Sequence, residues 1–274
     1  MTIAAPEIQA PAGGATGTRL GWVVADTLTL TWRNLLAYVR IPGAIFFYAI
    51  QPLLYVMLFR YVFGGALSLA LPRGTTYTDY LLPGIFVQTV TFGAVSTAIG
   101  LAEDLQKGLI ERFRALPMAR SAVLGGRIIA DTCRNIVIAG IITVVGYVVG
   151  FRIHTNVVAF LAGVLLILLF AYALSWGFAC IGLLAPNSES AQIMAFPVIF
   201  PLTFASSAFV PLSYMPGWLQ AFAEHQPISQ LVDAARALMQ GGPTASSVEQ
   251  TLAWSIGMIA ILCPLAVHLY RRAA

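Results

Sequence analysis

Six long apolar runs, separated by shorter polar stretches, dominate the pattern of this chain. A helix needs about 20 predominantly apolar residues to cross the hydrocarbon core of a membrane, and each run reaches about that length. The pattern therefore predicts an all-α membrane protein with six transmembrane helices. The runs cover approximately residues 44–63, 80–102, 128–151, 157–185, 191–211 and 250–270.

Segment 18–43 has the pattern of an amphipathic helix that precedes the first apolar run. Arg19, Asp26, Arg33 and Arg40 recur every seven residues, so they lie near one stripe of a helix, beside apolar and aromatic side chains. We expect this helix to lie at the membrane interface, where aromatic rings and long arginines both fit; the alternative is a solvated helix packed on a partner. Residues 1–17 do not resemble a signal peptide and are expected to form a disordered cytoplasmic tail.

The stretch 103–127 is polar and contains the only lysine of the chain, Lys107. Glu103 and Glu111 each lie four residues from this lysine, which places opposite charges on one face of a helix. Uncompensated charges in hydrocarbon cost about 2.5–3.5 kcal/mol each. We therefore expect this stretch to face water or a partner protein.

Segment 212–249 lies between the last two apolar runs and predicts two short helices. Pro227 ends the first helix, Ser229 is expected to cap the second, and Gly241 ends the second. Each helix is too short for a crossing, so we expect an extracellular re-entrant pair that enters the outer leaflet and returns.

The distribution of basic residues predicts the orientation of the chain. Six crossings place both termini on one side, and if that side is the cytoplasm the inner segments hold eleven of the 15 Lys and Arg residues. Because cytoplasmic segments carry the excess of Lys and Arg, we expect both termini in the cytoplasm. The net charge of +4 thus reflects membrane orientation, and we expect membrane lipids rather than nucleic acid around the protein.

Composition supports a membrane protein and excludes several kinds of chemistry. Hydrophobic residues make up 59% of the chain and charged residues 9%, whereas soluble domains carry about 25% charged residues. The single lysine is followed by Gly108, so the chain has no phosphate-binding P-loop, and its His and Cys residues show no catalytic or metal-binding spacing. Asp131 and Arg134, near the start of the third run, are three apart and able to pair. The chain therefore looks like a transport pathway that needs a separate motor subunit.

Two groups of residues resemble those of a known family, the type-2 ABC exporter permeases (ABC-2 family), in particular its daunorubicin-resistance-like branch. The resemblance covers nearly the whole chain from about Thr18. The first group lies around the polar stretch and comprises Glu103, Gly108, Glu111, Arg112, Ala115-Leu116-Pro117, Arg120, Gly126-Arg127 and Asp131. The second group lies in segment 212–249 and comprises Met215-Pro216-Gly217-Trp218-Leu219, Pro227, Asp233, Arg236 and Gly241.

The resemblance implies a transmembrane subunit, not itself an enzyme, that dimerises with an identical or sister permease subunit. It also implies a separately encoded ABC ATPase subunit, which would bind ATP and Mg, while this chain holds no cofactor. Segment 18–43 would be an interface helix beside the ATPase, with Arg33 and Arg40 as its site residues. The stretch 103–127 would form a coupling helix seated in a groove of the ATPase. Its coupling residues would be Glu103, Asp104, Lys107, Gly108, Leu109, Glu111, Arg112, Phe113, Arg114, Pro117 and Arg120.

The family further implies export of amphipathic cargo, such as a drug, an antibiotic or a lipid, across the bacterial plasma membrane. We extend this to a hypothesis that five aromatic rings on the second and fifth runs line an apolar constriction; a lipid-facing position of these rings is the alternative. The five are Phe86, Phe92, Phe196, Phe200 and Phe204. Two other functions stay open. One is export of a lipid-linked glycan, which a row of aromatic side chains along the pathway would favour, and the other is an ATPase-independent channel or secondary carrier.

Overall fold

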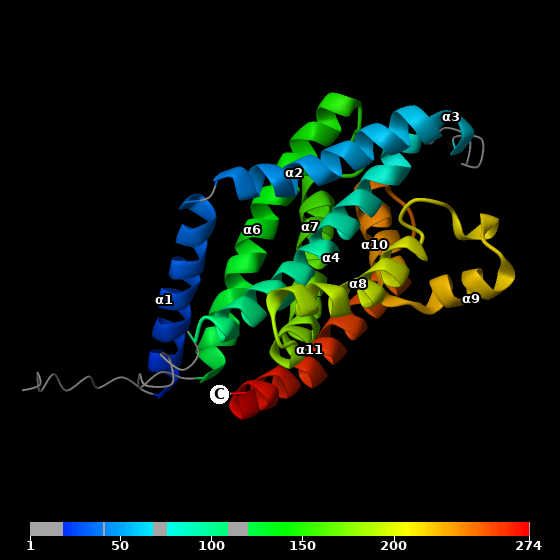
Figure 1. The fold of residues 1–274 in the computed structure, drawn as a ribbon. Coiled ribbons are helices and arrows are strands. Elements are labelled where there is room, and N and C mark those ends of the chain that lie inside the picture. The colour runs from blue at the N-terminus through cyan, green and yellow to red at the C-terminus, as the bar shows by residue number, and fades with distance from the viewer. Residues whose placement is uncertain (1–18, 41, 68–75, 109–119, 274) are drawn as a thin grey trace, which may run out of the picture.

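The computed structural model describes residues 19–40, 42–67, 76–108 and 120–273, and every regular element in these ranges is a helix (Figure 1). The predicted tail 1–17 lies outside the described residues, as does the middle of the predicted coupling loop, from residue 109 to 119. The expectation of an all-α protein is confirmed for the described part of the chain.

Four helices are long and apolar enough to cross a membrane: α4 (Tyr77–Gln106), α6 (Arg120–Val149), α7 (Val157–Leu184) and α11 (Ala245–Ala273). Helix α4 is the central one, because 78% of its most apolar window is buried inside the bundle. Helix α11 is peripheral, with 11% of the corresponding window buried, and it packs mainly along α7. The centre of the bundle is therefore α4, the helix at whose end the polar stretch begins.

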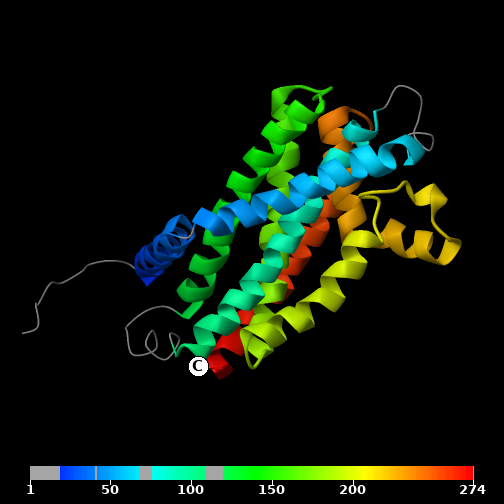
Figure 2. The same ribbon diagram turned by 45° about the horizontal axis from the view of Figure 1, so that its top comes forward.

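The expected count of six crossings is not confirmed, because the first and fifth apolar runs form shorter helices in the described residues. The first run forms α2 (Pro42–Met57), which continues through the π-helix η1 (Leu58–Phe63) into α3 (Gly64–Leu67) and crosses α4 and α6 obliquely (Figure 2). The fifth run forms α8 (Ser188–Phe204), which has 17 residues and ends seven residues before the predicted limit. Beyond its end, the amide of Ser207 donates to Ser229 Oγ (3.2 Å), so polar contacts with another helix replace further helical turns.

Two short helices occupy segment 212–249, as the sequence predicts: α9 (Gly217–His225) and α10 (Pro227–Gln240), after the 3-10 turn η3 (Leu212–Tyr214). Helix α10 ends at Gly241, whose φ of +97° suits glycine. The prediction that Ser229 caps α10 is wrong. Helix α10 starts at Pro227, whose fixed φ suits a first helical position, and Ser229 instead bonds to the segment after α8.

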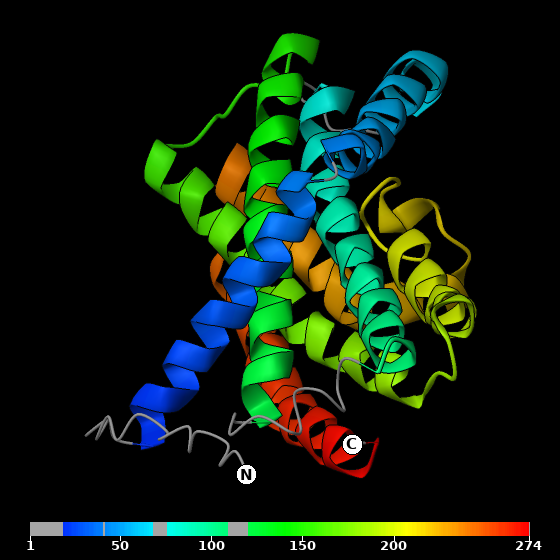
Figure 3. The ribbon, with the colours of Figure 1, turned by 60° about the vertical axis from the view of Figure 1, so that its left-hand side comes forward.

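Helix α1 (Arg19–Arg40) lies alongside the first half of α6 (Figure 3). The start of α1, the end of α4, the start of α6 and the end of α11 all lie at one end of the bundle (Figures 1 and 3). We call it the α1 end. The buried residues of α1, Leu30, Thr31 and Asn34, lie on one side of the helix, while Val24, Leu28 and Trp32 are exposed on another. Helix α1 is therefore amphipathic, as predicted, and its exposed apolar side has no cover within the described residues.

Candidate functional site

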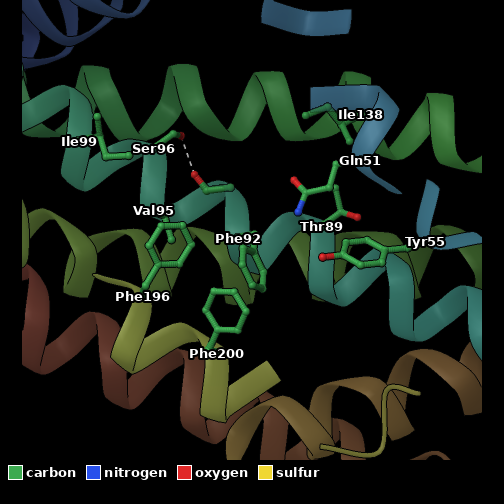
Figure 4. Close-up of a pocket in the computed structure, with 11 residues that line it drawn as sticks. Gln51, Tyr55, Thr89, Phe92, Val95, Ser96, Ile99, Ile138, Phe196 and Phe200 are labelled. Atoms are coloured by element: carbon green, nitrogen blue, oxygen red, sulfur yellow. Dashed lines mark hydrogen bonds between the residues drawn. The ribbon is translucent and has the colours of Figure 1, made fainter. Parts of the chain in front are cut away.

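A cavity of about 380 Å³ lies between α2, α4, α6 and α8 (Figure 4). Its wall is mainly aromatic and aliphatic, and the polar side chains in it, Gln51, Thr89 and Ser96, are uncharged. Such a lining suits a molecule with a large apolar surface and a few hydrogen-bonding groups. The full lining consists of Gln51, Tyr55, Thr89, Phe92, Gly93, Val95, Ser96, Ile99, Ile138, Phe196 and Phe200.

Three of the five phenylalanines proposed from the sequence meet at this cavity. Phe200 contacts Phe92 edge-on, with ring centroids 5.5 Å apart, and Phe196 at 5.3 Å. Phe204 stacks on Phe200 (5.4 Å) but lies beyond the cavity wall. Phe86 is fully buried and contacts Phe160 of α7, so the structure does not bring it to this cavity.

A second hollow lies beside the cavity. This open groove of about 500 Å³ is lined by Phe200, Pro201, Phe204, Ala205 and Leu219, so it runs from α8 to α9. Phe200 lines both hollows. The cavity and the groove are therefore neighbours that share the Phe200 ring on α8.

An ion pair is buried beside the cavity. Arg134 Nη1 lies 3.2 Å from Asp131 Oδ1, and the two side chains are 2% and 1% exposed. The pairing predicted from their spacing is thus confirmed. Arg134 also donates to the hydroxyl of Ser96 (2.6 Å) and to the carbonyl oxygen of Gly93 (3.0 Å). Since Ser96 and Gly93 line the cavity, the arginine supports the cavity wall from behind.

Helix α1 reaches the same ion pair through Tyr38. The Tyr38 hydroxyl donates to Asp131 Oδ1 and accepts from Arg134 Nη1 (3.1 Å). Burial, and next the negative charge of Asp131, raise the pKa of Tyr38 above its ordinary value, so the hydroxyl keeps its proton. Sequence reasoning did not identify Tyr38 as a site residue, because its partners are more than 90 positions away.

Three of the proposed coupling residues, Glu103, Asp104 and Lys107, are charged and form ion pairs at the α1 end. Asp104 Oδ2 lies 3.6 Å from Arg127 Nη1 and 3.9 Å from Arg33 Nη2, so it joins α4 to α6 and α1. The predicted pair of Glu103 and Lys107 is present at 2.5 Å, and its hydrogen bond raises the pKa of Lys107. Gly108 has a φ of +62° and directly follows Lys107, where α4 has ended.

The other proposed coupling residues, except Arg120, lie outside the described part of the chain. Those outside the described residues are Leu109, Glu111, Arg112, Phe113, Arg114 and Pro117. Arg120 is the first residue of α6, and Arg40 is the last residue of α1.

Gly126 allows α1 to approach α6 closely, and its replacement is a direct test of this packing. A Cβ at Gly126 would lie 2.8 Å from Leu30 Cβ and 3.0 Å from the carbonyl oxygen of Thr27. Gly126→Ala is therefore expected to lower the free energy of unfolding by about 1–3 kcal/mol, measured by thermal unfolding in detergent. The control is Gly125→Ala, whose Cβ would meet Thr27 Cγ2 at an ordinary 3.6 Å. Equal melting temperatures for the two variants would contradict close packing at Gly126.

Comparison with known proteins places this arrangement in a family. The family model described as "ABC-2 type transporter" matches residues 25–239. The chain is 34% identical over 248 residues to the daunorubicin resistance ABC transporter permease protein DrrB1 of Streptomyces coeruleorubidus, with 90% of this chain and 87% of that protein covered. It is 29% identical over 260 residues to the probable doxorubicin resistance ABC transporter permease protein DrrC of Mycobacterium tuberculosis, with 92% and 90% covered.

A more distant relative comes from an alga. The putative transport permease ycf38 of Porphyra purpurea is 26% identical over 216 residues, which cover 78% of this chain and 74% of that protein. The family match extends from α1 to the end of α10 and includes the cavity, the buried ion pair and both short helices. With its long apolar helices, the chain is a multi-pass membrane protein and belongs to the ABC-2 type transporter family.

Proposed function

We propose that this chain is the transmembrane subunit of an ATP-driven exporter of amphipathic molecules. The observation that carries the proposal is the uncharged, aromatic-lined cavity, which shares Phe200 with an open groove beside α9. A cavity of about 380 Å³ falls within the usual range for sites that hold small molecules. The names of two relatives refer to daunorubicin and doxorubicin resistance, which supports a drug-like cargo for this chain.

Energy would come from a separate ABC ATPase subunit that binds ATP and Mg. The residues proposed to contact it begin with Glu103 in the last turn of the central helix α4 and end with Arg120 at the start of α6, so a push on them would act on one wall of the cavity. Helix α1 would be the interface helix beside the ATPase. Both termini would lie in the cytoplasm of a bacterium, which agrees with the common position of the α1 start and the α11 end.

A second permease subunit would complete the pathway. Helices α2 and η1 expose Leu54, Tyr61 and Val62, and α8 exposes Ile193 and Val198. These surfaces flank the cavity, so a second subunit placed there would close it from the lipid side. Large exposed apolar surfaces of this kind mark contacts with either protein or lipid.

Co-expression with candidate ATPase subunits, followed by purification through a tag on this chain, tests the proposal. We expect an ATPase to co-purify in equal amount, and its activity in nanodiscs to respond to an amphipathic aromatic dye. Phe200→Ala is expected to reduce ATP-dependent dye export by about tenfold, since it removes the ring shared by the cavity and the groove.

Phe222→Ala is the matched control, because Phe222 is also 45% exposed but lines neither of these two hollows. Equal loss of export in both variants would argue against a specific path along α8. Export without any ATPase, driven by a pH gradient, would instead support a secondary carrier.

Export of a lipid-linked glycan is the second candidate, and one observation favours it. Beyond the cavity a row of rings continues from Phe204 to Phe209 (5.5 Å) and from Phe209 to Phe59 (4.6 Å). Sugars stack on free ring faces, but these rings stack on one another and Phe209 is only 5% exposed. We therefore rank the glycan second. Stimulation of the ATPase by a lipid-linked oligosaccharide and not by the dye would reverse this order.

A further inference from the structure

One guanidinium connects helix α1 to the wall of the cavity. On one side, Arg134 Nη1 lies 3.1 Å from the hydroxyl of Tyr38, and the guanidinium lies over the Tyr38 ring at 5.3 Å. On the other side, it donates to Ser96 and Gly93, which line the cavity. Arg134 thus joins α1 directly to two residues of the cavity wall.

Asp131 holds this arrangement in place. Its Oδ1 accepts from Tyr38 and Arg134, and its Oδ2 accepts from the hydroxyl of Thr97 at 2.6 Å. Both charged groups are almost completely buried. Separating them would leave charges without partners in a medium of low polarity, which is costly, so the cluster is expected to move as a unit.

Helix α1 lies at the surface of the bundle, where a partner protein could displace it. Its inner side packs on α6 through Leu30 and Thr31, while Leu28 and Trp32 are more than 60% exposed. Arg33, one helical turn and a half before Tyr38, lies near Asp104 at the end of α4. A protein that binds at the α1 end therefore has a rigid helix through which to act on Tyr38.

We propose that Tyr38, Asp131 and Arg134 form a polar junction that transmits the position of α1 to the cavity. Arg134 is a positioning residue: when Tyr38 moves, Arg134 moves, and Gly93 and Ser96 of the cavity wall follow. The inference deepens the proposed function and rests on it, because the ATPase is the partner expected to move α1 and the cavity is the expected cargo site.

The first test uses the permease alone in nanodiscs, without any ATPase. Cys133, Cys180 and Cys263 are replaced by alanine, and Thr89→Cys in the cavity wall reports access through its rate of labelling by a fluorescent maleimide. Tyr38→Phe removes the hydroxyl and keeps the ring and the ion pair. A hydrogen bond is worth about 1 kcal/mol, so we expect the labelling rate to change about fivefold.

Tyr172→Phe is the control, since the hydroxyl of Tyr172 makes no hydrogen bond in the described part of the chain and its ring contacts Trp176 of the same helix. Its labelling rate should equal that of the parent. Ser96→Ala removes the hydrogen bond between Arg134 and Ser96 of the cavity wall. The double variant, Tyr38→Phe with Ser96→Ala, should therefore change the labelling rate little more than either single variant does. An unchanged rate in Tyr38→Phe, or fully additive effects in the double variant, would overturn the junction.

The second test adds the ATPase and ATP. In the parent protein ATP is expected to change the labelling rate of the Thr89→Cys reporter, and Tyr38→Phe is expected to remove this response while the ATPase still binds. A response to ATP that is equal in both proteins would overturn the proposal. If ATP has no effect on the parent while the first test succeeds, the proposed function fails and the junction stands as an internal connection.

Discussion

Asp131→Ala is expected to cost about 3–5 kcal/mol of the free energy of unfolding, which is a large part of the stability of an ordinary domain. The substitution leaves Arg134 buried without its carboxylate and removes the acceptor used by Tyr38 and Thr97. It also takes away a carboxylate 3.8 Å from Arg127 Nε. Thermal unfolding measures the loss, with a thiol-reactive dye that labels the buried Cys180 as the protein opens.

The control for Asp131→Ala is Glu249→Ala, which also removes one carboxylate. Glu249 is exposed near the start of α11, and no hydrogen bond or ion pair of its side chain is found among the described residues. Its melting temperature should stay at that of the parent. A melting temperature of Asp131→Ala equal to that of the control would show that the buried ion pair contributes nothing to stability.

Gly84→Ala is expected to be at least as damaging, because it forces two backbones apart. A Cβ on Gly84 of α4 would lie 2.1 Å from the carbonyl oxygen of Ala208 and 2.9 Å from its Cα. The segment around Ala208 is held by Arg236, which donates to the carbonyl oxygens of Ser207 (2.9 Å) and Tyr80 (3.3 Å). It has little freedom to retreat, so we expect a loss of about 3 kcal/mol or more, measured by the same dye assay.

Gly140→Ala is the control, and it is expected to leave the free energy of unfolding unchanged or to raise it slightly. A Cβ at Gly140 of α6 meets nothing within 4 Å, and alanine is favoured over glycine inside a helix by about 1 kcal/mol. This variant should unfold at the temperature of the parent or slightly above it. A Gly84→Ala protein that melts together with Gly140→Ala would show that α4 and the segment after α8 are not in close contact.

Local patterns in the sequence predicted those features that involve residues within one or two helical turns of each other. The pairs Glu103 with Lys107 and Asp131 with Arg134 follow from spacing on a helix. The two short helices on either side of Pro227 follow from turn and cap residues. These features depend on neighbours in the chain, so a single sequence suffices to predict them.

Contacts between distant segments were beyond such reasoning. Nothing in the pattern around Tyr38 shows that it meets Asp131, and nothing around Ser229 shows that its hydroxyl binds the amide of Ser207 rather than capping α10. The division of five similar phenylalanines between a cavity, its rim and the buried core was equally hidden. Helix packing decides these positions, and apolarity alone does not distinguish a core ring from one that faces a cavity.

The peripheral position of α11 makes the protein sensitive to the thickness of its membrane. Its 29 residues give a rod of about 43 Å, longer than a hydrocarbon core of about 30 Å. Most of this helix is not covered by the rest of the described chain, so hydrophobic mismatch is expected to be accommodated by tilt, and the tilt would act on α7, against which α11 packs. The acyl-chain length of the surrounding lipids is therefore expected to change the tilt of α11 and, through it, the force that α11 exerts on α7.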